Sequence, residues 1–203
     1  MGKYYYTDLD KFDFSYLKNT RYEKVYEVLE EAKELHKKKD KSTCCYKLRY
    51  ALEIIVSDIL GIIGICKQKS INGDLKLIKN CVPIELRYYY EEDILNEMHN
   101  VRKAGNVGAH YYNSNGIDMA KAAHTSFIAM KKICKWLSDF ENRYYIYIKE
   151  KARQEEEARR LKEEENRKRV ERIKDVTIKV IKFSLNRIVP MLGDLMDKTL
   201  KKM

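Results

Sequence analysis

The sequence contains few residues that interrupt helices. Among 203 residues there are only 2 Pro and 8 Gly. Lys, Glu and Leu, which favour helices, are abundant, and apolar residues recur at three- and four-residue steps over long stretches. This scarcity of breakers argues against a turn-rich β architecture and predicts an all-α protein.

The chain also lacks the usual signatures of a metal site and of a membrane span. Its five cysteines form no Cys-x-x-Cys pair, and no Cys/His spacing is typical of zinc. It has no run of 18 uncharged apolar residues and no apolar signal core after Met1. We therefore expect no metal, no cofactor, reduced cysteines and a cytoplasmic location.

Basic residues exceed acidic ones, 41 to 31, giving a net charge of +10. The excess lies mainly towards the C-terminus, where residues 143–203 carry 18 basic and 11 acidic side chains. A basic surface is typical of proteins that bind polyanions such as RNA, DNA or anionic lipid. Solvated helix faces have the same composition, so charge alone leaves both interpretations open.

Patterning divides the chain into four regions. Residues 1–40 hold an aromatic segment and a first helix, residues 41–145 the core of a helical bundle, residues 146–175 a charged solvated helix, and residues 176–203 an amphipathic helix. Within the first two regions we expect helices over 20–38, 43–63 with Ser42 as N-cap, 73–80, 84–111 with a kink near Tyr90, and 117–141.

Several single residues invite predictions. The aromatic residues of 1–18 are expected to dock on the bundle, with base stacking as the alternative. Trp136 should cover one end of the core, and His36 should lie at the surface. His124 fits a core position and a site position equally well.

The last region has two competing interpretations. Its apolar residues are interrupted by Lys179, Lys182, Arg187 and Asp194, and Pro190 should kink or split the helix. Such a basic amphipathic helix fits a groove on a protein partner or lies on a membrane surface. Folding back and self-association are the plainer alternatives, and we favour protein contact over membrane.

The segment 101–110 has an unusual composition. Arg102, Asn106 and His110 are spaced by four, which places them on one face of a helix. Gly105 and Gly108, each unfavourable in a helix, make a smooth face that a second backbone or a ligand can approach. Tight helix packing explains the same glycines. His99 borders this face, and Arg49 can pair with Glu53 one turn away on another helix.

Three motifs in residues 42–137 carry a resemblance to a known family. They are Leu48–Glu53, then Leu75–Lys79 followed by Val82-Pro83, and Val101–Asn106 ending in His110. Together they resemble the domain of unknown function 4145 family of the HEPN-like (higher eukaryotes and prokaryotes nucleotide-binding) superfamily. The resemblance covers about half of the chain.

The resemblance implies a HEPN-like helical bundle, often a homodimer, that handles nucleic acid in prokaryotic or phage defence. Many such domains are metal-independent ribonucleases with an Arg, a polar neighbour and a His, which Arg102, Lys103 and His110 match. Seven residues separate Arg102 from His110, one more than that pattern has. Asn106 would orient the phosphate or the imidazole. Contacts to RNA or DNA would come from Arg49, His99 and Lys103, whereas Gly105, Gly108 and Glu53 would be structural.

Three functions follow from these observations. The first is a HEPN-like endoribonuclease, the second a non-catalytic nucleic-acid- or protein-binding module of the same fold, and the third a protein that docks to a partner or membrane through its C-terminal helix. Whether the chain is an enzyme stays open at this point.

Overall fold

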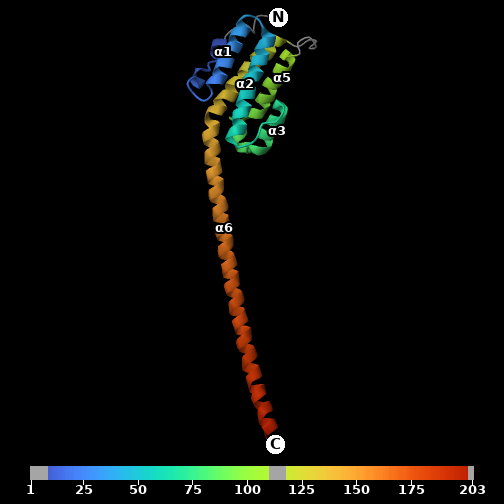
Figure 1. Ribbon diagram of the computed structural model, residues 1–203. Helices are drawn as coiled ribbons and strands as arrows, with labels where there is room; N and C mark the ends of the chain where they lie inside the picture. The colour runs from blue at the N-terminus through green and yellow to red at the C-terminus, as the bar shows by residue number, and fades with distance from the viewer. Residues whose placement is uncertain (1–8, 110–117, 201–203) are drawn as a thin grey trace. The chain divides into compact units, whose positions relative to one another are not determined.

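Six α-helices account for most of the chain described by the computed structural model, which covers residues 9–109 and 118–200. The predicted all-α class is confirmed (Figure 1). The chain divides into two compact units, Met1–Tyr145 and Ile146–Met203. The elements are two 3-10 turns, Leu9–Lys11 and Ser15–Leu17, then α1 (Glu23–Lys37), α2 (Lys41–Ile62), α3 (Ile71–Cys81), α4 (Ile84–Arg87), β1 (Tyr88–Tyr89), β2 (Glu92–Asp93), α5 (Ile94–Ala109) and α6 (Met119–Leu200).

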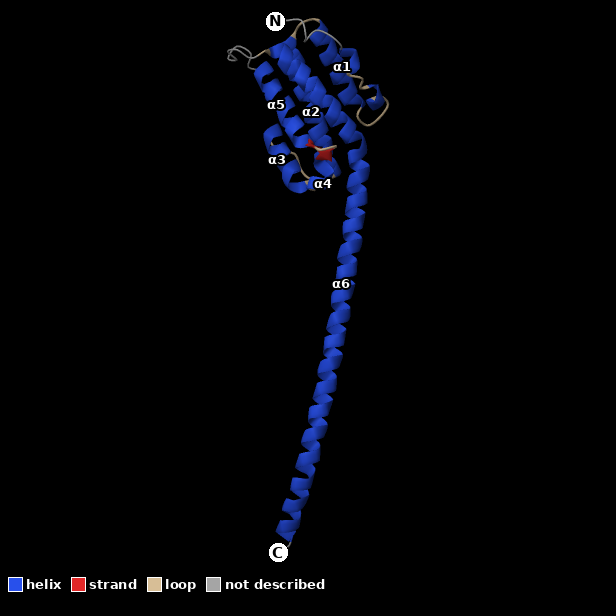
Figure 2. Ribbon diagram, turned by 180° about the vertical axis from the view of Figure 1, so that it is seen from behind, coloured by secondary structure: helices blue, strands red, loops and turns tan. Residues whose placement is uncertain are grey.

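Helix α2 is the centre of the first unit and lies between α1 and α5 in both ribbon views (Figures 1 and 2). The apolar residues on its core face are fully buried, among them Leu48, Leu52, Ile55 and Ile59. The predicted N-cap is wrong by two residues. Asp40 caps α2 by accepting a 3.1 Å hydrogen bond from the Thr43 N–H, because the helix begins earlier than the apolar pattern does.

Glycines bring α5 very close to α2. A Cβ added at Gly108 would lie 2.7 Å from the carbonyl oxygen of Ser42 and 3.0 Å from the Cβ of Cys45. The Ser42 hydroxyl, which does not cap its own helix, donates a 2.6 Å hydrogen bond to the Gly108 carbonyl instead. The smooth face expected on this segment is therefore used for packing inside the bundle.

The expected helix over 84–111 is interrupted, which corrects the sequence prediction. After the single turn of α4, the chain forms an antiparallel pair in which Tyr89 faces Glu92, and α5 begins only at Ile94 (Figure 2). Tyr90 has a φ of 55°, a left-handed turn conformation. Buried Arg87 supports this hairpin by donating to the Lys79 carbonyl at 3.0 Å and lying 3.8 Å from Asp93. These tertiary contacts override the helical periodicity.

Two aromatic side chains near the N-terminus dock on the bundle as predicted, whereas Tyr16 is exposed. Phe12 and Phe14 are buried, and the Phe12 ring stacks on Phe127 with 5.4 Å between centroids. The three tyrosines at positions 4–6 lie outside the described residues. Trp136 is also buried as expected, and its indole N–H donates to the Leu86 carbonyl at 2.8 Å.

The second unit, Ile146–Met203, is helical wherever it is described, and its charged stretch is exposed as predicted. Ion pairs one turn apart support it, including Glu156 with Arg160 at 2.8 Å and Glu164 with Lys168 at 2.6 Å. The helix continues through Pro190, so the expected split does not occur. In the described part of the chain, no helix has an apolar stretch long enough to cross a bilayer.

His36 is buried, which corrects its predicted surface position. The ring packs edge-on against Phe127 at 5.9 Å, and its Nε2 has no hydrogen-bond partner among the residues described. Burial, with smaller contributions from Lys41 and His124, lowers the pKa of His36 to about 4. His36 lies in the last turn of α1 and is followed by Lys37-Lys38-Lys39. These charged neighbours in the sequence led to the prediction of a surface position.

We expect Gly108→Ala to destabilise the bundle by about 1–3 kcal/mol, because the added methyl meets a backbone carbonyl that cannot rotate away. Gly61→Ala is the matched control, since a Cβ there meets nothing within 4 Å and α2 gains up to about 1 kcal/mol of helix propensity. Urea unfolding of both variants measures the difference. Equal midpoints for the two would contradict the close approach of α5 to α2.

Stability should fall as the pH drops from 7 to 5. Because the pKa of His36 is about 4 when folded and near 6.5 when unfolded, only the unfolded chain takes up a proton in this window. The expected loss from this group is about 2 kcal/mol. In His36→Leu, the free energy of unfolding measured with urea should change between pH 7 and pH 5 by that much less than in the wild type. An equal change in both proteins would rule out His36 as the source of the pH dependence.

Candidate functional site

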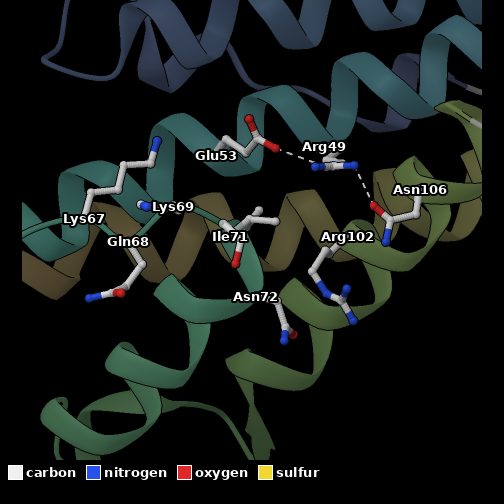
Figure 3. A pocket seen from close by; sticks show the side chains of 10 residues that line it. Arg49, Glu53, Lys67, Gln68, Lys69, Ile71, Asn72, Arg102 and Asn106 are labelled. Carbon is white, nitrogen blue, oxygen red and sulfur yellow. Dashed lines mark hydrogen bonds and ion pairs between the residues drawn. The ribbon is translucent and has the colours of Figure 1, made fainter.

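A cavity of about 450 Å³ lies where α2, α5 and the beginning of α3 meet. Helix α2 contributes Arg49 and Glu53, and α5 contributes Arg102 and Asn106. The loop before α3 supplies Lys67, Gln68, Lys69 and Ser70, and the first turn of α3 adds Ile71 and Asn72. Segments distant in sequence therefore gather polar and basic side chains around one hollow (Figure 3).

Arg49 is held in place by both neighbouring helices. Its Nε donates to Glu53 Oε1 at 3.0 Å, and its Nη1 donates to Asn106 Oδ1 at 2.5 Å (Figure 3). Gly105 makes room for this side chain, because a Cβ there would lie only 2.3 Å from the Cβ of Arg49. A guanidinium fixed in this way is preorganised, so less side-chain entropy is lost when it contacts a ligand.

Three other cations line the cavity. Arg102, Lys67 and Lys69 form no ion pair with any residue that the structure describes. The Nε of Arg102 is buried and likewise lacks a hydrogen-bond partner within the described ranges. A buried donor without a partner is unfavourable, and an anionic ligand is one group that would satisfy it.

The loop 67–70 is shaped by the first turn of α3. Ser70 caps that helix by accepting from the Gly73 N–H at 3.2 Å, and the buried carboxylate of Asp74 accepts from the Gln68 N–H at 2.6 Å. Asp74 thereby fixes the loop through a hydrogen bond from the Gln68 backbone N–H. The dipole of α3 is positive at this end, and the Asp74 carboxylate in its first turn offsets part of that positive charge.

The balance of charge decides what the cavity can hold. Four cationic side chains line it, against the single carboxylate of Glu53, which is already paired with Arg49. Lysine and arginine around a helix N-terminus form an environment for a phosphate or a similar anion. A cationic ligand would have to overcome this repulsion.

The structure brings together some of the predicted site residues and separates others. Arg49, Glu53, Arg102 and Asn106 share the cavity. Lys103 is exposed and borders a different groove between α5 and α6. His99 is half-buried outside the cavity, and burial, then Arg102 and Lys103, lower its pKa, which favours the neutral imidazole. His110 lies outside the described residues, so its predicted place beside Asn106 stays a prediction.

Sequence reasoning missed the loop contribution. Lys67 and Lys69 lie between the helices expected over 43–63 and 73–80, where no site residue was predicted, and Asp74 was not singled out. The available signal was a Lys-Gln-Lys-Ser run directly before a helix, in which Ser70 is the N-cap. Basic residues followed by a capping serine indicate cations gathered at a helix N-terminus.

Within the described ranges, the His, Cys, Asp and Glu side chains form no cluster of three or more suited to holding a metal ion. Among the free cysteines, Cys66 and Cys81 are exposed. Cys44, Cys45 and Cys134 are buried, and burial raises the pKa of Cys45 to about 12, so the neutral thiol predominates at pH 7.

In comparisons with known proteins, no family model, no curated protein and no solved structure gave a significant match to this chain.

We expect Asp74→Ala to destabilise the chain by about 1–3 kcal/mol, because the Gln68 N–H loses its acceptor and a buried space is left. Asp74→Asn is the matched control, since its amide oxygen can still accept from Gln68. Thermal unfolding compares the two. If Asn costs as much as Ala, the carboxylate charge rather than the hydrogen bond fixes the loop.

Proposed function

We propose that this chain is a HEPN-like nucleic-acid-associated protein that binds a phosphate of RNA or DNA in the cavity between α2, α5 and α3. One observation carries the proposal: Lys67, Lys69 and Arg102, none paired with a described acidic residue, line the same cavity at the N-terminus of α3. Cations left without partners at a hollow are the usual means by which proteins hold phosphate.

The division of labour among the basic residues supports this function. Arg49 and Arg102 are half-buried and come from packed helices, so they suit a defined phosphate position. Lys67 and Lys69 are exposed in the loop, where they suit the neighbouring phosphates of a longer strand. The net charge of +10 would add long-range attraction for a polyanion.

The resemblance of residues 42–137 to the domain of unknown function 4145 family motivates the HEPN-like part of the proposal. It also motivates a homodimeric assembly and a role in prokaryotic or phage defence. The all-α bundle is compatible with that resemblance. The cavity residues Arg49, Arg102 and Asn106 all fall within the motifs on which it rests.

Fluorescence anisotropy with labelled single-stranded RNA and DNA tests this binding. Arg102→Ala should weaken affinity on the order of tenfold and reduce the slope of log K against log salt by about 1. Lys103→Ala is the matched control, because it removes the same charge one residue further along α5 but outside the cavity. Its affinity should stay close to that of the wild type.

Two results would contradict phosphate binding in the cavity. One is equal weakening by Arg102→Ala and Lys103→Ala, which would indicate diffuse attraction by net charge. The other is an unchanged affinity in a Lys67→Ala, Lys69→Ala, Arg102→Ala triple variant whose thermal unfolding matches the wild type.

We propose metal-independent RNA cleavage as the activity of this site, with the non-catalytic binding module as its alternative. Arg102 would stabilise the charge that builds on the phosphorane, Asn106 would orient the phosphate, and His110 would transfer the proton between the 2′-hydroxyl and the leaving 5′-oxygen. The products would be a 2′,3′-cyclic phosphate and a 5′-hydroxyl. Arg102 and Asn106, which share the cavity one helical turn apart, favour this candidate.

Labelled RNA incubated with the protein in excess EDTA separates the two candidates. We expect cleavage by the wild type and none by His110→Ala, because that variant loses the group that moves the proton. His110→Ala should still bind the same RNA in anisotropy. Binding without cleavage by the wild type would establish the non-catalytic module, and cleavage by His110→Ala would remove this histidine from the mechanism.

A further inference from the structure

The second unit carries an exposed apolar seam that nothing in the bundle explains. Ile178, Ile181, Leu185, Ile188 and Leu192 are spaced by three, four, three and four residues along α6. Each of them is between 51% and 55% exposed. We call these five residues the seam. Alternating steps of three and four are the a and d positions of a heptad, the spacing by which helices pair along their length.

We propose that the seam binds a second copy of this chain, forming a coiled coil through α6. This inference does not rest on the proposed nucleic-acid function. All a and d positions from 178 to 192 are Ile or Leu, and the sequence continues the pattern at position 195. An identical copy offers a matching seam in the same register, and no polar residue in it selects a different partner.

The residues that flank the seam place no charge repulsion between identical copies. In a parallel pair, each residue at position e lies beside the residue five positions earlier, at position g, of the other copy. Lys182 would then lie beside Thr177, and Val189 beside Ser184. Identical helices therefore meet no like-charge contact along the seam. Pro190 falls at position f, on the side away from the partner.

The same heptad frame explains where the pairing ends. Between residues 157 and 174, every a position is Glu and every d position is Arg or Lys, namely Glu157, Arg160, Glu164, Arg167, Glu171 and Lys174. These side chains are exposed. Parallel copies would bring Glu opposite Glu and Arg opposite Arg there, so close pairing begins at Ile178 and the charged stretch stays solvated.

A second apolar strip on α6 provides the control. Ile173, Val176, Val180 and Phe183 are also exposed, but they occupy c and f positions, and Arg187 interrupts them at the next c position. Replacing two residues of either strip by Lys adds the same charge to the same helix. Only the seam pair would place that charge inside the coiled coil.

Sedimentation equilibrium of the full chain tests the proposal. We expect the wild type to have at least twice the 24.2 kDa chain mass at micromolar concentration. Ile181→Lys with Leu185→Lys should weaken association by roughly a hundredfold, because lysines would be buried in the a and d layers. Val180→Lys with Phe183→Lys should leave the association constant within about threefold of the wild type. Far-ultraviolet circular dichroism checks that both variants stay helical.

The other outcomes overturn the inference. If the wild type is monomeric at about 100 µM, the seam does not bind a second copy. If that monomer sediments with anionic phosphatidylglycerol vesicles, the seam binds a lipid surface instead. Association that survives the seam variant would assign the interface to another part of the chain. An equal loss in both variants would indicate nonspecific apolar contact. RNA affinity in anisotropy reports separately on the cavity.

Discussion

The close approach of α5 to α2 is the constraint on which the first unit depends. At Gly108 a helix backbone lies against the carbonyl of Ser42, and at Gly105 it lies against the side chain of Arg49. Glycine inside a helix costs about 1 kcal/mol relative to alanine, so two of them within one turn require a compensating gain. That gain is the dense packing of the buried α2 face and the Ser42–Gly108 hydrogen bond.

The same contact determines the electrostatics of the cavity. Because α5 lies so close, Asn106 can reach Arg49 and accept its hydrogen bond, and Arg102 lies one turn away at the same hollow. Arg49 is then satisfied by Glu53 and Asn106, whereas the Nε of Arg102 is buried without a described partner. Helix packing thus fixes the guanidinium of Arg49 through two neighbours and leaves a donor of Arg102 without a described partner.

Sequence patterns predicted the fold class and the main helices because apolar periodicity and the scarcity of Pro and Gly are local signals. They placed Arg49, Glu53, Arg102 and Asn106 among the site residues because those residues occur in motifs. They failed at the hairpin of Tyr88–Asp93, where the long-range contacts of Arg87 override helical spacing. They failed at His36 because the Phe127 ring that helps to bury it lies 91 residues further along the chain. Lys67 and Lys69 were missed because only the folded chain brings their loop to α5.

The two units use charged residues in opposite ways. Along 150–174, exposed Glu and Arg or Lys alternate on one helix face, so each charge has a neighbour of opposite sign within a turn and the stretch attracts no particular ligand. In the first unit, Asp74 accepts from the Gln68 amide and Glu53 pairs with Arg49, and neither carboxylate forms an ion pair with Lys67, Lys69 or Arg102 among the described residues. In the charged helix, therefore, most charges are balanced by a neighbour along the same helix. At the cavity, Lys67, Lys69 and Arg102 have no described acidic partner, because Glu53 is bonded to Arg49 and Asp74 to Gln68.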